Sequence, residues 1–127
     1  MKTNEDIEQY LIDMNMPYEK LGDGIWALNN TEEGIDNIII MHSAPLIIFR
    51  VKLMPLPANN RAELMEVLLR LNAEEMTGGA YGIEGDNVVI IDSLQSENLD
   101  FNEFQGSIDC LSMAIREHYP ILKGFRA

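Results

Sequence analysis

The sequence predicts an α+β domain in which helices pack on an antiparallel sheet, with elements in the order αβββαββα. Two observations support this prediction. Apolar residues recur with helical spacing in three segments, and five other segments alternate or are short β-branched runs. Clusters of glycine, proline and asparagine separate these segments. The chain has 127 residues, a usual length for one core, so residues 1–127 are expected to form a single domain.

The first half of the chain is predicted to form one helix and three strands. Thr3 and Asp6 have the spacing of a capping box, and Pro17 ends the helix. Trp26, the one tryptophan, is expected in the core. The apolar face of this helix has helical spacing: Ile7, Tyr10, Leu11 and Met14. Strands are expected over 18–28, with a break at 22–24, and then over 38–41 and 46–54.

The second half is predicted to form a helix, two strands and a last helix. Asn60 and Glu63 suggest a capping box for a helix over 61–76. Strands 81–84 and 88–94 should pair as a hairpin around Gly85-Asp86-Asn87. Asp100 with Glu103 should cap a helix that runs to about Tyr119, next to Pro120. The apolar stripe of this helix is narrow: Phe101, Phe104, Ile108, Leu111, Ile115 and Tyr119.

The helix over 61–76 carries more apolar surface than packing on a sheet requires. Its apolar side chains form two stripes about 120° apart, which together span an arc about 200° wide. The first stripe should face the sheet and consists of Leu64, Val67, Leu68 and Leu71. The second stripe, Met65, Leu69 and Met76, is therefore expected to contact something besides the chain's own sheet.

Charge and composition exclude several classes of function. The net charge is −12, which repels nucleic acid and anionic membranes. The N-terminal residues are acidic rather than basic and apolar, so no signal peptide is expected, and no apolar run is long enough to span a bilayer. A single cysteine, Cys110, and eight methionines suit a reducing cytoplasm. We expect a cytoplasmic protein that does not bind nucleic acid or membrane.

No segment has the pattern of a catalytic or metal site. The glycine-rich stretch 78–82 follows a helix and opens a strand, the reverse of a phosphate-binding loop. Glu32, Glu33 and Asp36 do not have calcium-loop spacing. His42, His118 and Cys110 match no nucleophile motif. We therefore expect no catalytic residues, no cofactor and no metal, and the alternative is a site assembled only in three dimensions.

The strand over 46–54 is the candidate partner-binding element. Alternation places Ile47, Phe49, Val51 and Leu53 on one face and Leu46, Ile48, Arg50 and Lys52 on the other. The second face is half apolar and half basic, and burying two unpaired cations would be costly, so it should stay uncovered by helices. We expect Leu46 and Ile48 to contact a partner segment and Arg50 and Lys52 to orient its polar groups, with the segment adding as a strand.

The pattern as a whole resembles two related families. The helix end Leu68-Leu69-Arg70-Leu71-Asn72 is followed by Gly79-Ala80-Tyr81-Gly82-Ile83-Glu84-Gly85-Asp86 and the strand Val88-Val89-Ile90-Ile91. This resembles the YbjN domain family, regulators with the type III secretion chaperone fold, and the element order resembles the Tir-chaperone family of that fold. The resemblance covers about residues 4–119.

The resemblance implies a function as well as a fold. Such chaperones are homodimers that hold a segment of a partner in an extended state, and it implies a dimer interface formed by Met65, Leu69 and Met76. We expect a non-enzymatic, chaperone-like, homodimeric protein-binding module. The alternatives are a YbjN-type regulatory domain that acts by protein contact, and a small-molecule binder or enzyme.

Overall fold

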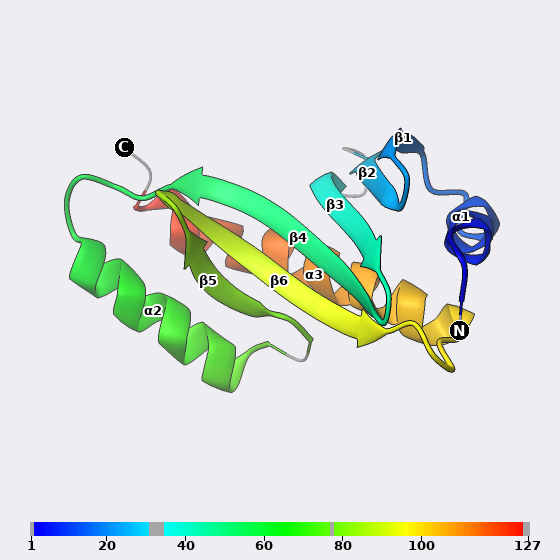
Figure 1. Ribbon diagram of the computed structural model, residues 1–127. Coiled ribbons are helices and arrows are strands. Elements are labelled where there is room, and N and C mark those ends of the chain that lie inside the picture. The colour runs from blue at the N-terminus through cyan, green and yellow to red at the C-terminus, as the bar shows by residue number, and fades with distance from the viewer. Residues whose placement is uncertain (1, 31–34, 77, 126–127) are drawn as a thin grey trace.

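The computed structural model describes residues 2–30, 35–76 and 78–125. Six antiparallel strands form one sheet in the order β1-β2-β3-β4-β6-β5, which confirms the predicted α+β class (Figure 1). The helices are α1 (Asn4–Asp13), α2 (Arg61–Glu74) and α3 (Phe101–Lys123). The strands are β1 (Tyr18–Gly22), β2 (Ile25–Asn30), β3 (Ile35–Ser43), β4 (Leu46–Pro55), β5 (Ala80–Glu84) and β6 (Asn87–Gln95).

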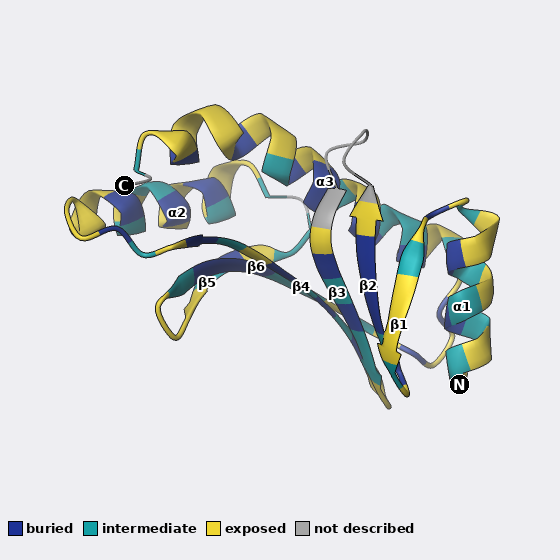
Figure 2. Cartoon of the chain, turned by 90° about the horizontal axis from the view of Figure 1, so that it is seen from above, coloured by how far each residue is buried: buried dark blue, intermediate teal, exposed yellow. Residues whose placement is uncertain are grey.

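The helices lie on one side of the sheet, as Figures 1 and 2 show. The longest helix, α3, runs behind β4 and β6, while α1 lies beside β1 and β2 and α2 lies beside the edge strand β5. The opposite side of the sheet, which we call the open face, carries no helix of the described chain. An antiparallel sheet tolerates this arrangement because alternate side chains point to opposite faces.

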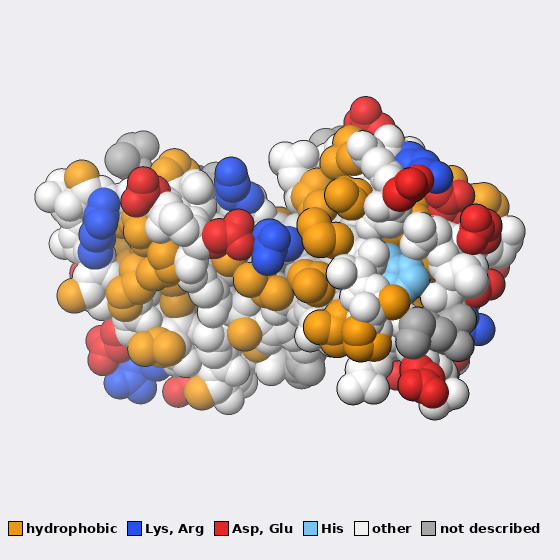
Figure 3. Space-filling view, viewed as in Figure 1, with side chains coloured by type: hydrophobic (Ala, Val, Ile, Leu, Met, Phe, Trp, Pro, Cys, Tyr) orange, Lys and Arg blue, Asp and Glu red, His pale blue; other side chains and the backbone are white. Residues whose placement is uncertain are grey.

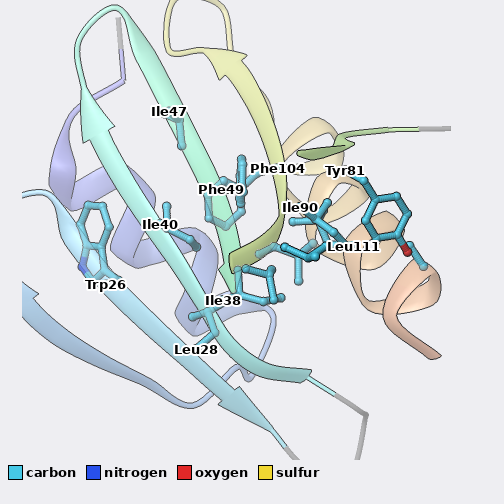
Figure 4. Packing of buried hydrophobic residues seen from close by; sticks show 14 of the residues in the cluster. Trp26, Leu28, Ile38, Ile40, Ile47, Phe49, Tyr81, Ile90, Phe104 and Leu111 are labelled. Atoms are coloured by element: carbon cyan, nitrogen blue, oxygen red, sulfur yellow. The ribbon is translucent and has the colours of Figure 1, made fainter. Parts of the chain in front are cut away.

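The core fills the space between the sheet and the helices (Figure 4). Phe49 of β4 packs against Phe104 of α3, with ring centroids 5.6 Å apart, and the ring of Tyr10 of α1 also contacts Phe104, with centroids 5.4 Å apart. Trp26 is fully buried, as the sequence predicted. The largest fully buried side chains come from α1, α2, α3 and four strands: Trp26, Phe49, Phe104, Ile7, Leu11, Leu28, Ile38, Ile40, Ile47, Leu64, Ile90 and Ile108.

A polar junction joins α1 to the first hairpin. The Trp26 indole donates a hydrogen bond of 3.1 Å to Glu8 Oε1, and Lys20 Nζ lies 3.3 Å from the same oxygen. The indole hydrogen bond, with a smaller contribution from Lys20, holds the pKa of Glu8 below its usual value. A buried tryptophan therefore satisfies its N–H through a helix that packs over it.

Two of the three predicted capping boxes are present. Thr3 with Asp6, and Asp100 with Glu103, exchange the expected pairs of hydrogen bonds. The box predicted at Asn60 and Glu63 is wrong, because Asn60 has a φ of 61° and makes no side-chain cap bond. A left-handed residue at this position turns the chain between Pro57 and the first turn of α2.

Several element boundaries and local features differ from the prediction. Gly22-Asp23-Gly24 does not interrupt one strand; it turns the chain, so residues 18–30 form a hairpin and the sheet gains a sixth strand. A bulge between Lys52 and Met54 places Met54, rather than Leu53, in the core. The last helix continues past Pro120 to Lys123, and Leu122 is buried beyond the proline. Burial of that leucine offsets the backbone hydrogen bond that Pro120 removes.

Candidate functional site

The open face carries neighbouring apolar side chains from four strands. The register places Ile25, Met41 and Ile48 in one row, and Ile39, Arg50 and Ile91 in the next. Figure 3 shows hydrophobic side chains gathered on this side of the molecule, over β3 and β4. We call six of these residues the open-face patch, none of which is buried: Ile25, Ile39, Met41, Leu46, Ile48 and Ile91. A partner can therefore contact this patch without displacing a helix.

The four residues predicted to bind a partner all lie on the open face. Alternation along β4 buries Ile47, Phe49 and Val51 on the helix side, and the intervening residues point the other way. Leu46 is 40% exposed and Lys52 is exposed, whereas Ile48 and Arg50 are half-buried. The structure thus brings Leu46, Ile48, Arg50 and Lys52 to one surface, and their role in binding stays a prediction.

The sequence did not identify the members of the patch outside β4. Ile25, Ile39, Met41 and Ile91 reach the open face because β2, β3 and β6 align with β4 in a specific register. Ile39 and Met41 belong to a continuous apolar run, which does not reveal which side each residue faces. Only cross-strand pairing decides that question.

Arg50 is already paired within the chain. Its Nε lies 3.2 Å from Glu84 Oε2, and because β6 separates β4 from β5, this ion pair crosses β6. Val89 of β6 lies on the open face yet is only 1% exposed, in accord with the arginine side chain lying over it. The Nε hydrogen is buried and has no hydrogen bond of acceptable geometry, so the ion pair leaves this donor unsatisfied. A partner group meets a neutralised arginine here rather than an unpaired cation.

β4 lies in the interior of the sheet, between β3 and β6. Both sides of its backbone are engaged in pairing, which excludes the expected addition of a partner strand to β4 itself. A segment that contacts Leu46 and Ile48 must do so through side chains. Backbone pairing with a partner requires an edge strand, and the edges of this sheet are β1 and β5.

The predicted dimer residues divide into two locations. Leu69 is 69% exposed on the outward face of α2, next to half-buried Met65, and both line a wide, shallow depression on that helix. Met76 lies beyond the last residue of α2 and lines a separate small hollow against α3. Met65 and Leu69 therefore share a face, and Met76 does not belong to it.

Within the described residues, the titratable side chains do not converge on a reactive centre. His118 was expected at the end of its helix, but it is buried within α3 and makes a hydrogen bond through Nδ1 with the Tyr81 hydroxyl. Burial raises the pKa of that hydroxyl. His42 Nδ1 contacts Asn4 Oδ1 at 2.7 Å, and Cys110, which forms no disulfide, is half-buried. Glu32 and Glu33 lie outside the described residues.

The described ranges contain neither a candidate metal site nor a candidate membrane-spanning helix. No cluster of three or more histidine, cysteine or acidic side chains there could hold a metal ion. No helix in those ranges is long and apolar enough to cross a membrane.

Solved structures that share the fold include the following three. YbjN from E. coli, a putative transcription regulator, aligns with a TM-score of 0.71 and 20% identity over 94% of this chain and 92% of that one. A chain of the heterodimeric ExoU–SpcU complex from the Pseudomonas aeruginosa type III secretion system aligns with a TM-score of 0.72 and 14% identity, over 90% of this chain and 95% of that one. A chain of the HopA1–SchA chaperone–effector complex aligns with a TM-score of 0.64 and 12% identity, over 86% of each chain. At these identities the likeness establishes the fold alone.

Comparison with protein families gives a more specific result. No curated protein matches the chain significantly. The family model CesT_Tir_1, however, matches residues 1–127, the whole of the chain. This match agrees with the resemblance found in the sequence and with the sheet topology. The chain belongs to the CesT_Tir_1 family.

Proposed function

We propose that the chain is a non-enzymatic, chaperone-like module that holds a segment of a partner protein against the open-face patch. The observation that carries the proposal is a helix-free sheet face on which six apolar side chains remain unburied. Apolar side chains that adjoin across several strands are typical of protein-binding surfaces. Membership of the CesT_Tir_1 family supports a chaperone-like role, as does the likeness to a chain of a chaperone–effector complex.

The binding mode follows from the position of β4. The partner segment lies across the patch and contacts it through side chains, so its affinity comes mainly from apolar burial. Backbone pairing can add to this at β1, where Glu19, Lys20 and Leu21 are exposed along a sheet edge. β1 is short and has a bulge after Lys20, which limits the length of any added strand.

Charge selects the kind of partner. The net charge of −12 attracts basic segments and keeps the complex soluble. The Arg50–Glu84 pair is neutral as a unit, so the centre of the open face does not repel a basic segment. A segment with apolar residues and flanking lysines or arginines fits this surface.

A homodimer through α2 is part of the proposal. Leu69 is exposed on the outward face of that helix, and Met65, which packs partly against the core, lines the same depression. A second copy of the same face would cover them in an isologous contact. Burial there does not compete with the open-face patch, so the dimer and the partner complex can exist together in the cytoplasm.

A second candidate is a regulatory domain that acts by protein contact. It is favoured by the likeness to YbjN, described as a putative transcription regulator, which extends over nearly the full length of both chains. Direct contact with nucleic acid is disfavoured by the strongly acidic charge. Under this alternative the same patch would bind a regulatory protein instead of an unfolded segment.

The test compares a patch variant with a matched control. Leu46→Ser combined with Ile48→Ser removes two apolar side chains from the open face. Ile121→Ser removes one of similar exposure, 43% against 40% for Leu46, from α3 behind the sheet. Proteins captured from the native cytoplasm are identified by mass spectrometry for wild type and both variants.

We expect a partner that wild type and Ile121→Ser capture and that the double variant does not. Each capture uses the same amount of folded protein, so that a loss of stability does not account for the difference. Retention by the double variant would exclude the patch as the binding surface. Digestion of the captured complex separates the two candidate functions, since a held segment is protected in an extended form whereas a regulatory partner remains a folded domain.

A further inference from the structure

The β5 edge of the sheet is closed by a side chain from α2. β5 pairs with β6 alone, through the register Ala80↔Ile91 to Glu84↔Asn87. In an antiparallel pair, alternate residues direct their backbone groups toward the partner strand and away from it. Glu84 and Asn87 flank a two-residue turn, so Glu84 and Gly82 face β6 and Tyr81 and Ile83 face the edge.

Asn72 occupies the place of a neighbouring strand at Tyr81. Its Oδ1 accepts a hydrogen bond of 2.7 Å from the Tyr81 N–H, and its Nδ2 donates one of 3.2 Å to the Tyr81 carbonyl oxygen. A residue on an adjacent strand would make this same pair of bonds. The side-chain amide therefore satisfies both backbone groups that an edge residue normally leaves open.

Tyr81 is also fixed from the other side. Its hydroxyl makes a hydrogen bond with His118 of α3, and the two rings lie with centroids 5.6 Å apart. Only 6% of Tyr81 is exposed. Asn72 thus binds a backbone segment that is already held in place, which favours a lasting contact over a transient one.

The blocked position leaves little of β5 for pairing. Of the two edge-facing residues, Asn72 engages Tyr81, and Ile83 remains with an exposed side chain. Strand addition needs successive backbone bonds at every second residue, so a single remaining position does not fix a register. Covering an edge in this manner is a known protection against unwanted pairing between sheets.

We propose that Asn72 is the residue that closes the β5 edge, so that an extended chain can add to the described sheet as a strand only at β1. The closure itself is a property of the isolated protein. Its consequence for a partner rests on the proposed function, because it determines which end of the sheet a held segment can extend.

The first test measures amide hydrogen exchange on the purified protein. Asn72→Ala removes both bonds to Tyr81, whereas Asn72→Asp keeps an acceptor for the N–H and loses the donor. We expect the Tyr81 amide to exchange about tenfold faster in Asn72→Ala, as for the loss of one net hydrogen bond, and to change less in Asn72→Asp. The Gly82 amide, which faces β6, is the internal control and should stay protected in both variants.

The second test asks whether the opened edge pairs with another copy of the chain. Asn72→Ala should show a concentration-dependent increase in mass above wild type by light scattering. Adding Ile83→Lys, a charge on the same edge, should return the mass to the wild-type value, and Ile83→Lys alone should behave as wild type. Association that persists in the Asn72→Ala, Ile83→Lys variant would place the contact elsewhere and overturn the proposal.

An unchanged exchange rate of the Tyr81 amide in Asn72→Ala would also overturn the proposal that Asn72 closes the β5 edge. Loss of Gly82 protection in both variants would show that Asn72 supports the sheet as a whole rather than its edge, which also contradicts the proposal. Neither test uses a partner protein, so a chain that captures no partner can still show edge closure, and the two proposals fail independently.

Discussion

The outward face of α2 allows the dimer to be tested with one substitution, Leu69→Asp. Leu69 is 69% exposed, so a second copy has most of that side chain left to cover. Full burial of a leucine contributes about 1.5–3 kcal/mol, and the exposed share of it is about 1–2 kcal/mol. An isologous contact contains the residue twice, so the substitution removes about 2–4 kcal/mol from association. The dimer dissociation constant should rise about 30-fold to 700-fold, at 1.4 kcal/mol for each factor of ten.

The charge of the new side chain acts in the same direction. Glu63 and Glu66 line the same depression, and a two-fold axis would bring two further copies of them close to the introduced carboxylates. Repulsion between these groups adds to the lost apolar contact and weakens with salt. The monomer is affected less, because only about a third of the leucine is buried in it; we expect a loss of about 1 kcal/mol in unfolding free energy.

Light scattering and sedimentation over a range of micromolar concentrations measure the association, and urea unfolding measures the stability. Ile12→Asp is the matched control, since Ile12 is 54% exposed on α1, at the other end of the molecule (Figure 1). Wild type and Ile12→Asp should have twice the mass of one chain, as dimers, whereas Leu69→Asp should have the mass of one chain, as a monomer. A monomeric wild type, or a Leu69→Asp variant that remains dimeric, would refute the reasoning.

Three further predictions concern other parts of the chain. The pKa of Glu8 lies below its usual 4.5, so its contribution to stability is present above about pH 4.5 and is lost as the pH falls through the folded-state pKa. In an acid titration followed by Trp26 fluorescence, Glu8→Gln should flatten the decrease in stability below about pH 4.5. An unaltered profile would show that the Glu8–Trp26 contact does not contribute to the pH dependence of stability. Asn60→Gly should preserve the urea midpoint and Asn60→Ala should cost about 1 kcal/mol, because φ is positive there and no cap bond is lost; equal losses would contradict this. Cys110→Ser should leave mass, stability and partner capture at wild-type values, and loss of capture alone would reveal a functional thiol.

Local patterns were reliable where neighbouring residues decide the structure. The boxes at Thr3 and Asp100 formed as predicted because each is completed within one helical turn. Asn60 has the same spacing to Glu63, yet the path of the chain from β4 to α2 requires a left-handed residue there. The alternation of β4 was also predicted, up to the bulge at Lys52 that moves Met54 into the core. A bulge depends on the partner strand and leaves no mark in the alternation before it.

The sequence by itself determined the α+β class, the acidic surface and the side of β4 on which Leu46 and Ile48 lie. It also determined the apolar faces of the helices, except at the end of α3, where Tyr119 is exposed and His118 and Leu122 are buried instead. These properties follow from residue type and from spacing along one element, and both are local. The tertiary structure decided that β4 is central, that Arg50 is paired with Glu84, and that Asn72 lies on the β5 edge. Each of these depends on which strands become neighbours, and neighbours are chosen by the packing of the whole core rather than by any one segment.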